Sequence, residues 1–243
     1  MIISKNLKNI VVLTGAGISA ESGIDTFRDQ NGLWENHDIM DVASPQGFER
    51  NAQLVYEFYN QRRKQLLSDT VAPNAAHIAL KKLEDNFDGE FSIITQNVDD
   101  LHERCGTKSV IHMHGELLKM RCVKTKEVFT TKSNFDEFTN CPCCLESGNL
   151  RPHIVWFGEI PFQLGKIEQL LSQCDLFISI GTSGSVYPAA MFVQLAKSNK
   201  NCLTIEQNLS ETQVSENFDT LIHGSSSIEI PKLVEEILKN NNS

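Results

Sequence analysis

The feature that most constrains the fold is a short apolar strand that runs into a loop of small residues. The run Ile10-Val11-Val12-Leu13 is followed by GAGISAESG at positions 15–23. Such a strand can bring backbone N–H groups against a pyrophosphate, which side chains in the loop would obstruct. Gly15, Gly17 and Ala20 fit the G-x-G-x-x-G/A dinucleotide pattern. A tight structural turn would look similar, so this pattern alone leaves both interpretations open.

The chain after this loop departs from the usual dinucleotide-binding pattern. A standard fold of that kind has a second apolar strand that ends in Asp or Glu about 20 residues further on. Here residues 25–38 read DTFRDQNGLWENHD, which predicts no strand. The chain therefore binds a dinucleotide in another manner, or binds none.

Further apolar runs predict a parallel α/β sheet, because each is separated from the next by enough chain for a crossover helix. The predicted strands lie near residues 9–14, 91–95, 153–157, 174–180, 202–205 and 219–222. A final helix, Ile230 to Asn240, is expected to pack on the sheet. Two excursions at strand ends, 30–75 and 118–152, are expected to roof a cleft. We expect one domain whose larger part comprises residues 1–29, 76–117 and 153–243, with a smaller module formed by these excursions.

Composition narrows the class of function. The 243 residues include 22 basic and 31 acidic side chains, a net charge of -9, which argues against nucleic-acid binding. An acidic surface suits a cationic partner such as a lysine-rich protein tail, although many soluble proteins are acidic. The sequence shows no membrane span and no targeting segment, so we expect a cytoplasmic protein. Four of the seven cysteines fall within 122–144, which favours thiolate or metal chemistry over disulfides.

An ordered set of motifs resembles the sirtuins, the NAD-dependent protein-lysine deacylases. The motifs are Asp25, Phe27 and Arg28, then Gly32-Leu33-Trp34, QNVDDLH at 96–102, HMHGEL at 112–117, HIVWFGE at 153–159, GTSGSVYPAA at 181–190, and Asn208. The resemblance runs from Ile10 to the final helix and is closest to bacterial sirtuins of the type that includes the mitochondrial desuccinylase. It implies a Rossmann-like domain with a helical, zinc-ribbon-like module.

The resemblance also implies how NAD is held. Gln96, Asn97 and Asp99 would line the pocket for nicotinamide and its ribose, although polar residues after a strand can also cap a helix. Asn208 and Ser226 match contacts on the adenosine side. The full set implied to bind the cofactor is Gly15, Ala16, Gly17, Ile18, Glu21, Asp25, Phe27, Arg28, Trp34, Gln96, Asn97, Val98, Asp99, Gly181, Thr182, Ser183, Asn208 and Ser226.

One histidine matches the catalytic base of the family. A histidine that faces a cleft can take a proton from a sugar hydroxyl, although a single histidine is more often structural. By resemblance His114 is the base and His112 is structural. In the implied reaction the acyl oxygen attacks the nicotinamide ribose carbon, nicotinamide leaves, and the products include lysine and O-acyl-ADP-ribose. A mono-ADP-ribosyltransferase and a non-catalytic NAD-binding regulator remain alternatives.

A predicted helix from Ala52 to Leu67 carries an arginine within an apolar stripe. Val55, Phe58, Tyr59, Arg62 and Leu66 share one face at helical spacing. A desolvated guanidinium requires an anion, which could be an internal carboxylate, unless the side chain reaches water. By resemblance, Tyr59 and Arg62 receive the carboxylate of succinyl and malonyl groups. The family further implies that Val155, Phe157, Gly158 and Glu159 line the acyl-lysine tunnel, although this run could be an internal strand.

The cysteine segment departs from the family pattern. Most sirtuins bind structural zinc with two C-x-x-C pairs. Cys141 and Cys144 form the second pair, but the first pair is reduced to Cys122 because Thr125 stands at its partner's position. The fourth ligand could be Cys143, water or nothing, and a module without metal is the alternative. The remaining cysteines, Cys105, Cys174 and Cys202, are expected to be small core residues.

Overall fold

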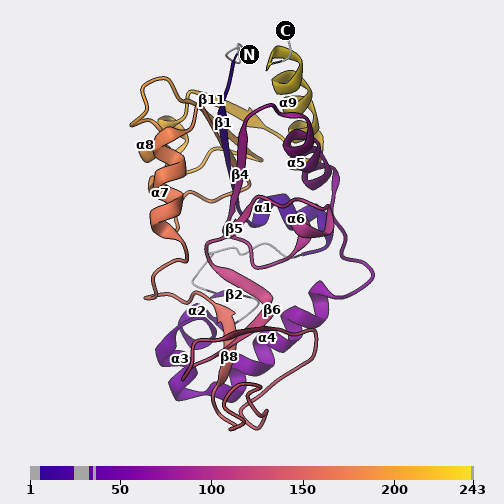
Figure 1. Ribbon diagram of the computed structural model, residues 1–243, viewed down its shortest axis with the longest axis vertical. Coiled ribbons are helices and arrows are strands. Elements are labelled where there is room, and N and C mark those ends of the chain that lie inside the picture. Colours follow the sequence, from indigo (N-terminus) through magenta and orange to yellow (C-terminus); the bar gives the residue numbers. More distant parts are fainter. Residues whose placement is uncertain (1–5, 25–32, 35–36, 242–243) are drawn as a thin grey trace.

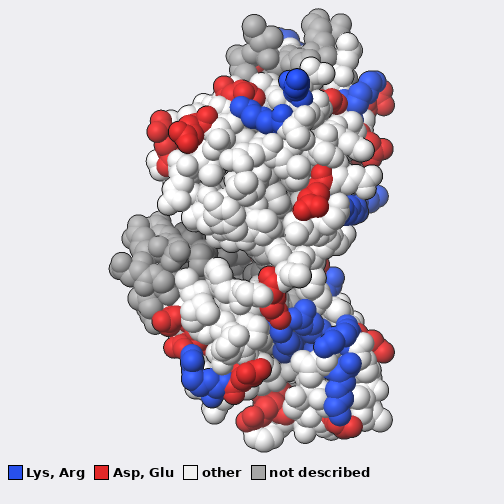
Figure 2. Space-filling model, turned by 90° about the vertical axis from the view of Figure 1, so that its left-hand side faces the viewer, with Lys and Arg blue, Asp and Glu red and all other residues white. Residues whose placement is uncertain are grey.

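The computed structural model of this chain describes residues 6–24, 33–34 and 37–241. It has two parts that follow one another along the long axis (Figure 1). The upper part contains a six-stranded sheet between helices, and the lower part contains a three-stranded sheet with helices beside it. The face shown in Figure 2 narrows between the two parts, and charged side chains of both signs gather over the lower part.

The six-stranded sheet is parallel throughout and has the order β11-β10-β9-β1-β4-β5. The chain starts in the middle of the sheet, continues to one edge, and then returns to build the other half. This is the order of a Rossmann-like fold, and it reverses between β1 and β9. The strands are β1 (Asn9–Thr14), β4 (Glu90–Thr95), β5 (Val110–His112), β9 (Leu176–Ile180), β10 (Leu203–Asn208) and β11 (Thr220–His223).

Helices cover both faces of this sheet because its strands are apolar on both sides. Ile10 and Val12 of β1 pack toward α5 (Ala75–Asn86) and α9 (Ser226–Asn241). Val11 and Leu13 pack toward α7 (Leu164–Gln173) and α8 (Phe192–Ala196) on the opposite face. Figure 1 shows the two helix pairs on either side of the sheet. The predicted α/β sheet is therefore confirmed, and the final helix begins before the predicted Ile230.

One predicted strand is wrong. Residues 153–157 do not join the parallel sheet, because β8 (Leu150–Ile154) pairs antiparallel with β6 (Gly115–Cys122) in the lower part. The sixth strand of the main sheet is β5, a three-residue strand that was not among the predicted strands. A buried apolar run indicates a strand, but it does not reveal the partner strand, which here lies in the second sheet.

The lower part combines α2 (Ile39–Val42), α3 (Pro45–Arg50) and α4 (Ala52–Leu66) with the sheet β7-β6-β8, in which β7 spans Val128–Thr130. Phe58, Leu117 and Trp156 belong to its core. The two-residue strands β2 (Leu33–Trp34) and β3 (His37–Asp38) pair with each other, so the prediction of no strand at 25–38 is wrong for these four residues. The short helices α1 (Ala16–Ser19) and α6 (Leu101–Arg104) follow β1 and β4. Among the helices described, none has the length and apolarity needed to cross a membrane.

Candidate functional site

The turns after β1 and β9 pack backbone against backbone at the point where the strand order reverses. Gly15 N donates to Ile180 O at 3.0 Å, and Gly17 N donates to Gly181 O at 2.9 Å. A Cβ on Gly17 would lie 2.6 Å from the Gly181 Cα, and Gly181 itself has a φ of +61°. The close approach of the two turns therefore excludes a side chain at Gly17 and at Gly181, independently of any ligand that the loop binds. In open α/β sheets this reversal point is where ligands bind.

A buried chain of hydrogen bonds ties the segment after β4 to this turn. Asn97 Nδ2 donates to Gly15 O and to Ser19 Oγ, both at 3.1 Å. Ser19 Oγ in turn donates to Asp99 Oδ2 at 3.0 Å. Burial raises the pKa of Asp99, which the hydrogen bonds from Leu101 N and Ser19 partly offset. The structure thus brings Asn97 and Asp99 together as predicted, and adds Ser19, which the sequence showed only as one small residue among several in the loop.

A second buried polar group lies at the ends of the same strands. Thr14 Oγ1 donates to Thr95 Oγ1 at 2.9 Å and lies 3.2 Å from His102 Nε2. The His102 and His77 rings are 4.9 Å apart. Burial lowers the pKa of His77 to about 4 and that of His102 well below its usual value, so both rings are neutral at neutral pH. Nothing in the local sequence distinguishes a buried histidine from an exposed one, so these two histidines could not be recognised from the sequence.

His114 lies where the two parts of the chain meet. Gly115, with a φ of +87°, follows it, and a Cβ there would be 2.0 Å from His153 O. His114 Nδ1 is 3.1 Å from Gln96 O. A carbonyl oxygen only accepts, so Nδ1 carries the hydrogen and Nε2 keeps a lone pair. Burial lowers the pKa of His114, with the bond to Gln96 opposing, which keeps the ring neutral.

His112 differs from its neighbour two positions on. Its Nε2 lies 2.6 Å from Glu103 Oε1 and 3.8 Å from Glu116 Oε1. Burial opposes its charge, but the hydrogen bond and the two carboxylates outweigh burial and raise its pKa. A ring held between two acids is a structural ion pair, which agrees with the structural role expected for it.

The other predicted cofactor residues have different surroundings. Asn208 Nδ2 donates to Thr182 O at 2.6 Å, and Ser226 Oγ donates to Gln207 Oε1 at 2.7 Å. Glu21 accepts from Ser225 and Ser227, which attaches the loop to the start of α9. Ser183 is exposed, Ala16 begins α1, and Ile18 and Val98 pack in or against the apolar cores. Gln96, Ser179 and Thr182 line a pocket at the carboxyl end of the sheet. Asp25, Phe27, Arg28 and the Trp34 side chain lie outside the described residues.

Helix α4 carries two adjacent arginines, and Arg63 is the more deeply buried of the two. Arg63 is 1% exposed, donates from Nε to Leu117 O at 3.2 Å, and donates from Nη1 to Asn60 Oδ1 at 2.6 Å. Burial lowers the pKa of Arg63 to about 10. Arg62 is half-buried, with its guanidinium carbon 5.3 Å from the centre of the Phe58 ring. The predicted apolar face is present, with Arg62 half-buried against Phe58, and α4 in addition buries Arg63.

Tyr59, one turn before Arg62, is fully buried and accepts a hydrogen bond from Trp156 Nε1 at 3.0 Å. Burial raises the pKa of its phenol, which is therefore protonated at neutral pH. Tyr59 and Trp156 share the same apolar core with Ile154 of β8. The predicted acyl receptor and the predicted tunnel wall thus lie against each other.

The predicted tunnel wall is itself bonded into the protein. Val155 N donates to His114 O at 2.8 Å, and Phe157 N donates to Ala43 O at 2.9 Å. Phe157 and Gly158 are exposed, whereas Val155 is half-buried. The Glu159 carboxylate forms ion pairs with Arg121 and Arg151, so this side chain is paired within the protein itself. A substrate strand would have to use the remaining backbone groups.

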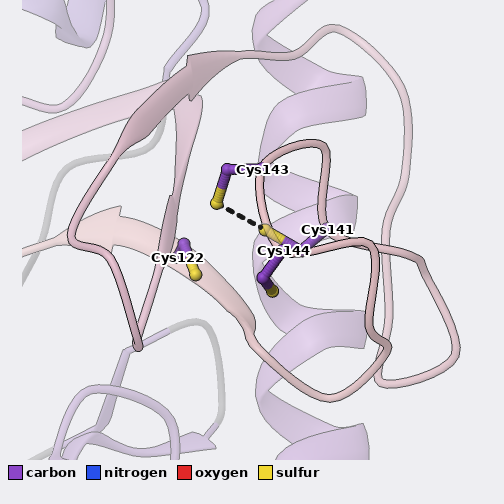
Figure 3. Close-up of side chains that lie close together, drawn as sticks. All are labelled: Cys122, Cys141, Cys143 and Cys144. Carbon is purple, nitrogen blue, oxygen red and sulfur yellow. Dashed lines mark hydrogen bonds between the residues drawn. The ribbon is translucent and has the colours of Figure 1, made fainter.

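Four cysteines lie close together in the lower part (Figure 3). Cys122 ends β6, while Cys141, Cys143 and Cys144 come from one loop, and the four sulfur atoms lie within 4.8 Å of one another. Thiolates around tetrahedral zinc are about 3.8 Å apart, because each Zn–S bond is about 2.3 Å. The N–H of Thr125 lowers the pKa of Cys122 to about 6, which favours the thiolate that metals bind. The four cysteines are thus positioned to bind a metal ion.

Comparison with known proteins decides between the possible families. A model of the Sir2 family matches residues 15–188. The chain belongs to this family. An "NAD-dependent protein deacylase" of Vibrio cholerae is 55% identical over 231 residues, which cover 95% of this chain and 94% of that protein. A protein of the same name from Pasteurella multocida is 55% identical over 229 residues, covering 94% and 97%.

Solved structures agree. A Sir2 homologue in complex with NAD is 36% identical, with a TM-score of 0.86, and the match covers 96% of this chain and 90% of that one. Sir2Af2 bound to a myristoylated histone peptide is 33% identical, with a TM-score of 0.73 and coverage of 96% and 92%. The predicted sirtuin resemblance and the Rossmann-like fold with a smaller helical, cysteine-bearing module are therefore confirmed.

Proposed function

We propose that this Sir2-family chain is an NAD-dependent protein deacylase that removes acyl groups from protein lysines. The observation that carries this proposal is the geometry of His114. Its Nδ1 is directed to Gln96 O, and burial keeps the ring neutral. Nε2 is therefore the atom that can accept a proton from a ribose hydroxyl. The relatives named as NAD-dependent protein deacylases support the same activity.

The residues at the reversal point of the sheet fit a dinucleotide. A pocket at the carboxyl ends of the strands includes Gln96, Ser179 and Thr182, and Asn97 holds the adjoining turn in place. When bound, NAD supplies the ribose carbon that takes the acyl oxygen while nicotinamide leaves. Asn97 and Asp99 would orient the nicotinamide end, whereas Asn208 and Ser226 would contact the adenosine end. His114 Nε2 would then accept the ribose proton, which activates that hydroxyl toward the acyl carbon.

Acidic acyl groups are the substrates that the lower part suits best. Arg62 is half-buried against an aromatic ring, so its guanidinium is only partly hydrated. A guanidinium fork binds a carboxylate through two charge-assisted hydrogen bonds. Arg62 would receive the carboxylate of a succinyl or malonyl group, with Tyr59 completing the pocket from one turn away. Acetyl groups, which carry no anion, would be accepted without this contact.

The cysteine cluster would hold a structural zinc ion. Cys122, Cys141 and Cys144 are the predicted ligands, and Cys143 would serve as the fourth. Its sulfur lies 3.1 Å from Thr125 Oγ1, the residue at the position of the missing C-x-x-C partner. The insertions 30–75 and 118–152 would act together as the smaller unit that roofs the cleft. We place the protein in the cytoplasm, where its seven thiols, all free in the structure, would remain reduced.

The test is mass spectrometry of matched acetylated and succinylated lysine peptides, each incubated with and without NAD. We expect lysine to appear only with NAD, with one nicotinamide released for each acyl group removed. Hydrolysis at full rate without NAD would refute the proposal. ADP-ribose attached to a protein acceptor, with the peptide left acylated, would instead identify a mono-ADP-ribosyltransferase.

A further inference from the structure

The side chain of Trp156 is held from three directions. The Arg151 guanidinium carbon lies 3.3 Å from the centre of its ring. The ring also packs against Phe48, with the two centres 5.2 Å apart. The indole Nε1 donates to Tyr59 Oη at 3.0 Å. With only 2% of its surface exposed, Trp156 has one position available, and that position fixes where its N–H is directed.

Arg151 is in turn held by a carboxylate. Its Nη1 donates to Glu159 Oε1 at 2.7 Å and its Nη2 to Glu159 Oε2 at 3.0 Å, which is the bidentate geometry of a strong ion pair. Glu159 Oε2 also accepts from Trp156 N at 2.9 Å. Glu159 Oε1 also lies 3.2 Å from Arg121 Nη2, so the carboxylate forms ion pairs with two arginines that lie opposite each other on β6 and β8. Glu159 therefore holds both the backbone of Trp156 and the cation stacked on its ring.

The bond from Trp156 determines how Tyr59 can act. The indole N–H occupies the oxygen of the phenol as an acceptor, so the hydroxyl hydrogen is turned away from the indole. An acceptor that already receives a hydrogen bond becomes a better donor, because bonds in a chain polarise one another. The bond from Trp156 Nε1 to Tyr59 Oη thereby joins the 153–159 segment to the helix that carries Arg62, within an apolar core.

We propose that Trp156, held by the Arg151–Glu159 ion pair, is a positioning residue that sets selectivity for acidic acyl groups by orienting the Tyr59 hydroxyl. This inference rests on the proposed function, in which Tyr59 and Arg62 receive the acyl carboxylate. It assigns to Glu159 a role in holding the pocket wall rather than in contacting the substrate. Trp156 itself does not touch the carboxylate.

The variant that tests this is Trp156→Phe, which keeps an aromatic ring for Arg151 to stack on but removes the N–H donor together with part of the ring volume. The readout is the ratio of kcat/KM for a succinylated peptide to that for the matched acetylated peptide, with NAD saturating. We expect this ratio to fall about 2- to 10-fold, the effect of one neutral hydrogen bond. A purely structural role would lower both rates together and leave the ratio unchanged, which would overturn the proposal.

A double-mutant cycle with Tyr59→Phe shows whether Trp156 acts through Tyr59. If it does, Trp156→Phe will lower the ratio no further once the hydroxyl is gone. Multiplicative effects of the two substitutions would contradict the proposal. Arg62→Met separates this failure from that of the proposed function. If Arg62→Met lowers the ratio and Trp156→Phe does not, only the positioning role fails; if neither does, the acyl receptor itself is wrong.

Discussion

The two sides of the candidate cleft are built from different kinds of atoms. On the nucleotide side, backbone meets backbone: Gly15 and Gly17 lie against Gly181, and a Cβ at Gly15 would be 2.8 Å from Gly181 O. On the acyl side, side chains make the contacts, from Arg62 on α4 to Trp156 and the ion pair behind it. A side chain added at one of these glycines would clash with backbone atoms. On the acyl side, by contrast, one side chain can be replaced without disturbing the backbone.

This difference means that the chemistry and the acyl preference should be separable by mutation. His114 is joined to the nucleotide side through Gln96 O, and Arg62 belongs to the acyl side. Substitutions at the first should affect every substrate, whereas those at the second should affect only acidic acyl groups. The following experiments test that separation.

The largest effect on turnover is expected from His114→Phe. Because the lost group is a general base, kcat should fall about 10²- to 10⁴-fold on both acetylated and succinylated peptides. NAD binding, measured by calorimetry, should persist. His112→Phe is the matched comparison, and it should lower the melting temperature through loss of its pairing with Glu103. Residual His114→Phe activity within about tenfold of wild type would indicate a different base.

Arg62→Met should have a smaller and selective effect. A charge-assisted contact is worth roughly 1.5–3 kcal/mol, so kcat/KM on the succinylated peptide should fall about 10- to 100-fold. Deacetylation should change much less. Lys64→Met, two positions on and exposed, is the control and should leave both rates unchanged. An equal loss on both substrates would make Arg62 a structural residue and remove the distinction between the two sides.

The pH dependence of turnover should be governed by His114, on the nucleotide side of the cleft. The base must be unprotonated, and burial lowers the pKa of His114, so the acid limb of kcat should lie below the ordinary histidine value of about 6.5. Below its pKa the rate should fall about tenfold per unit for either peptide. Melting temperatures must be measured at each pH, because loss of activity in acid could also come from unfolding. The buried His77 is neutral in the folded protein and gains a proton on unfolding, so it destabilises the fold as pH drops from about 6.5 toward 4. An acid limb centred above 6.5 would exclude His114 as the base observed.

Cys143→Ser should have the smallest effect on turnover, since the Cys143 sulfur contacts Thr125 and Cys141 within the cysteine cluster. Its effect should appear in zinc retention, because a fourth thiolate is lost. Elemental analysis during chelator titration should show earlier loss of metal. Thr125→Cys in the Cys143→Ser background rebuilds a C-x-x-C pair with Cys122 and should restore retention. Undiminished metal in the single variant would show that Cys143 is not a ligand.

Several features of the fold could be predicted because they depend on local pattern. The run at 9–14 and the run at 174–180 are apolar on both faces, which indicates strands buried between helices. By contrast, residues 153–157 have the same apolar character but pair with β6, which no local pattern reveals. The edge strand β5 was too short to be recognised as a strand of the main sheet.

The candidate site shows the same limit. Helical spacing placed Arg62 on the apolar face, where it packs against Phe58, but it did not reveal that the neighbouring Arg63 is buried and bonded to Leu117 O and Asn60 Oδ1. The sequence also identified four crowded cysteines without showing which sulfur replaces the partner missing at Thr125. The structure brings Cys143 within reach because the loop folds back onto the end of β6.

The sequence by itself determined the family and most strands of the main sheet, and it singled out His114 as the proposed base, because these features depend on patterns in contiguous residues. The tertiary structure decided which buried groups meet: Gly17 with Gly181, Glu159 with Arg151 and Arg121, and Trp156 with Tyr59. Strand and helix periodicity describes only which side of an element is apolar. The identity of a partner far away in the chain depends on how the elements pack, and the hydrogen bonds that orient a site form only after that packing is complete.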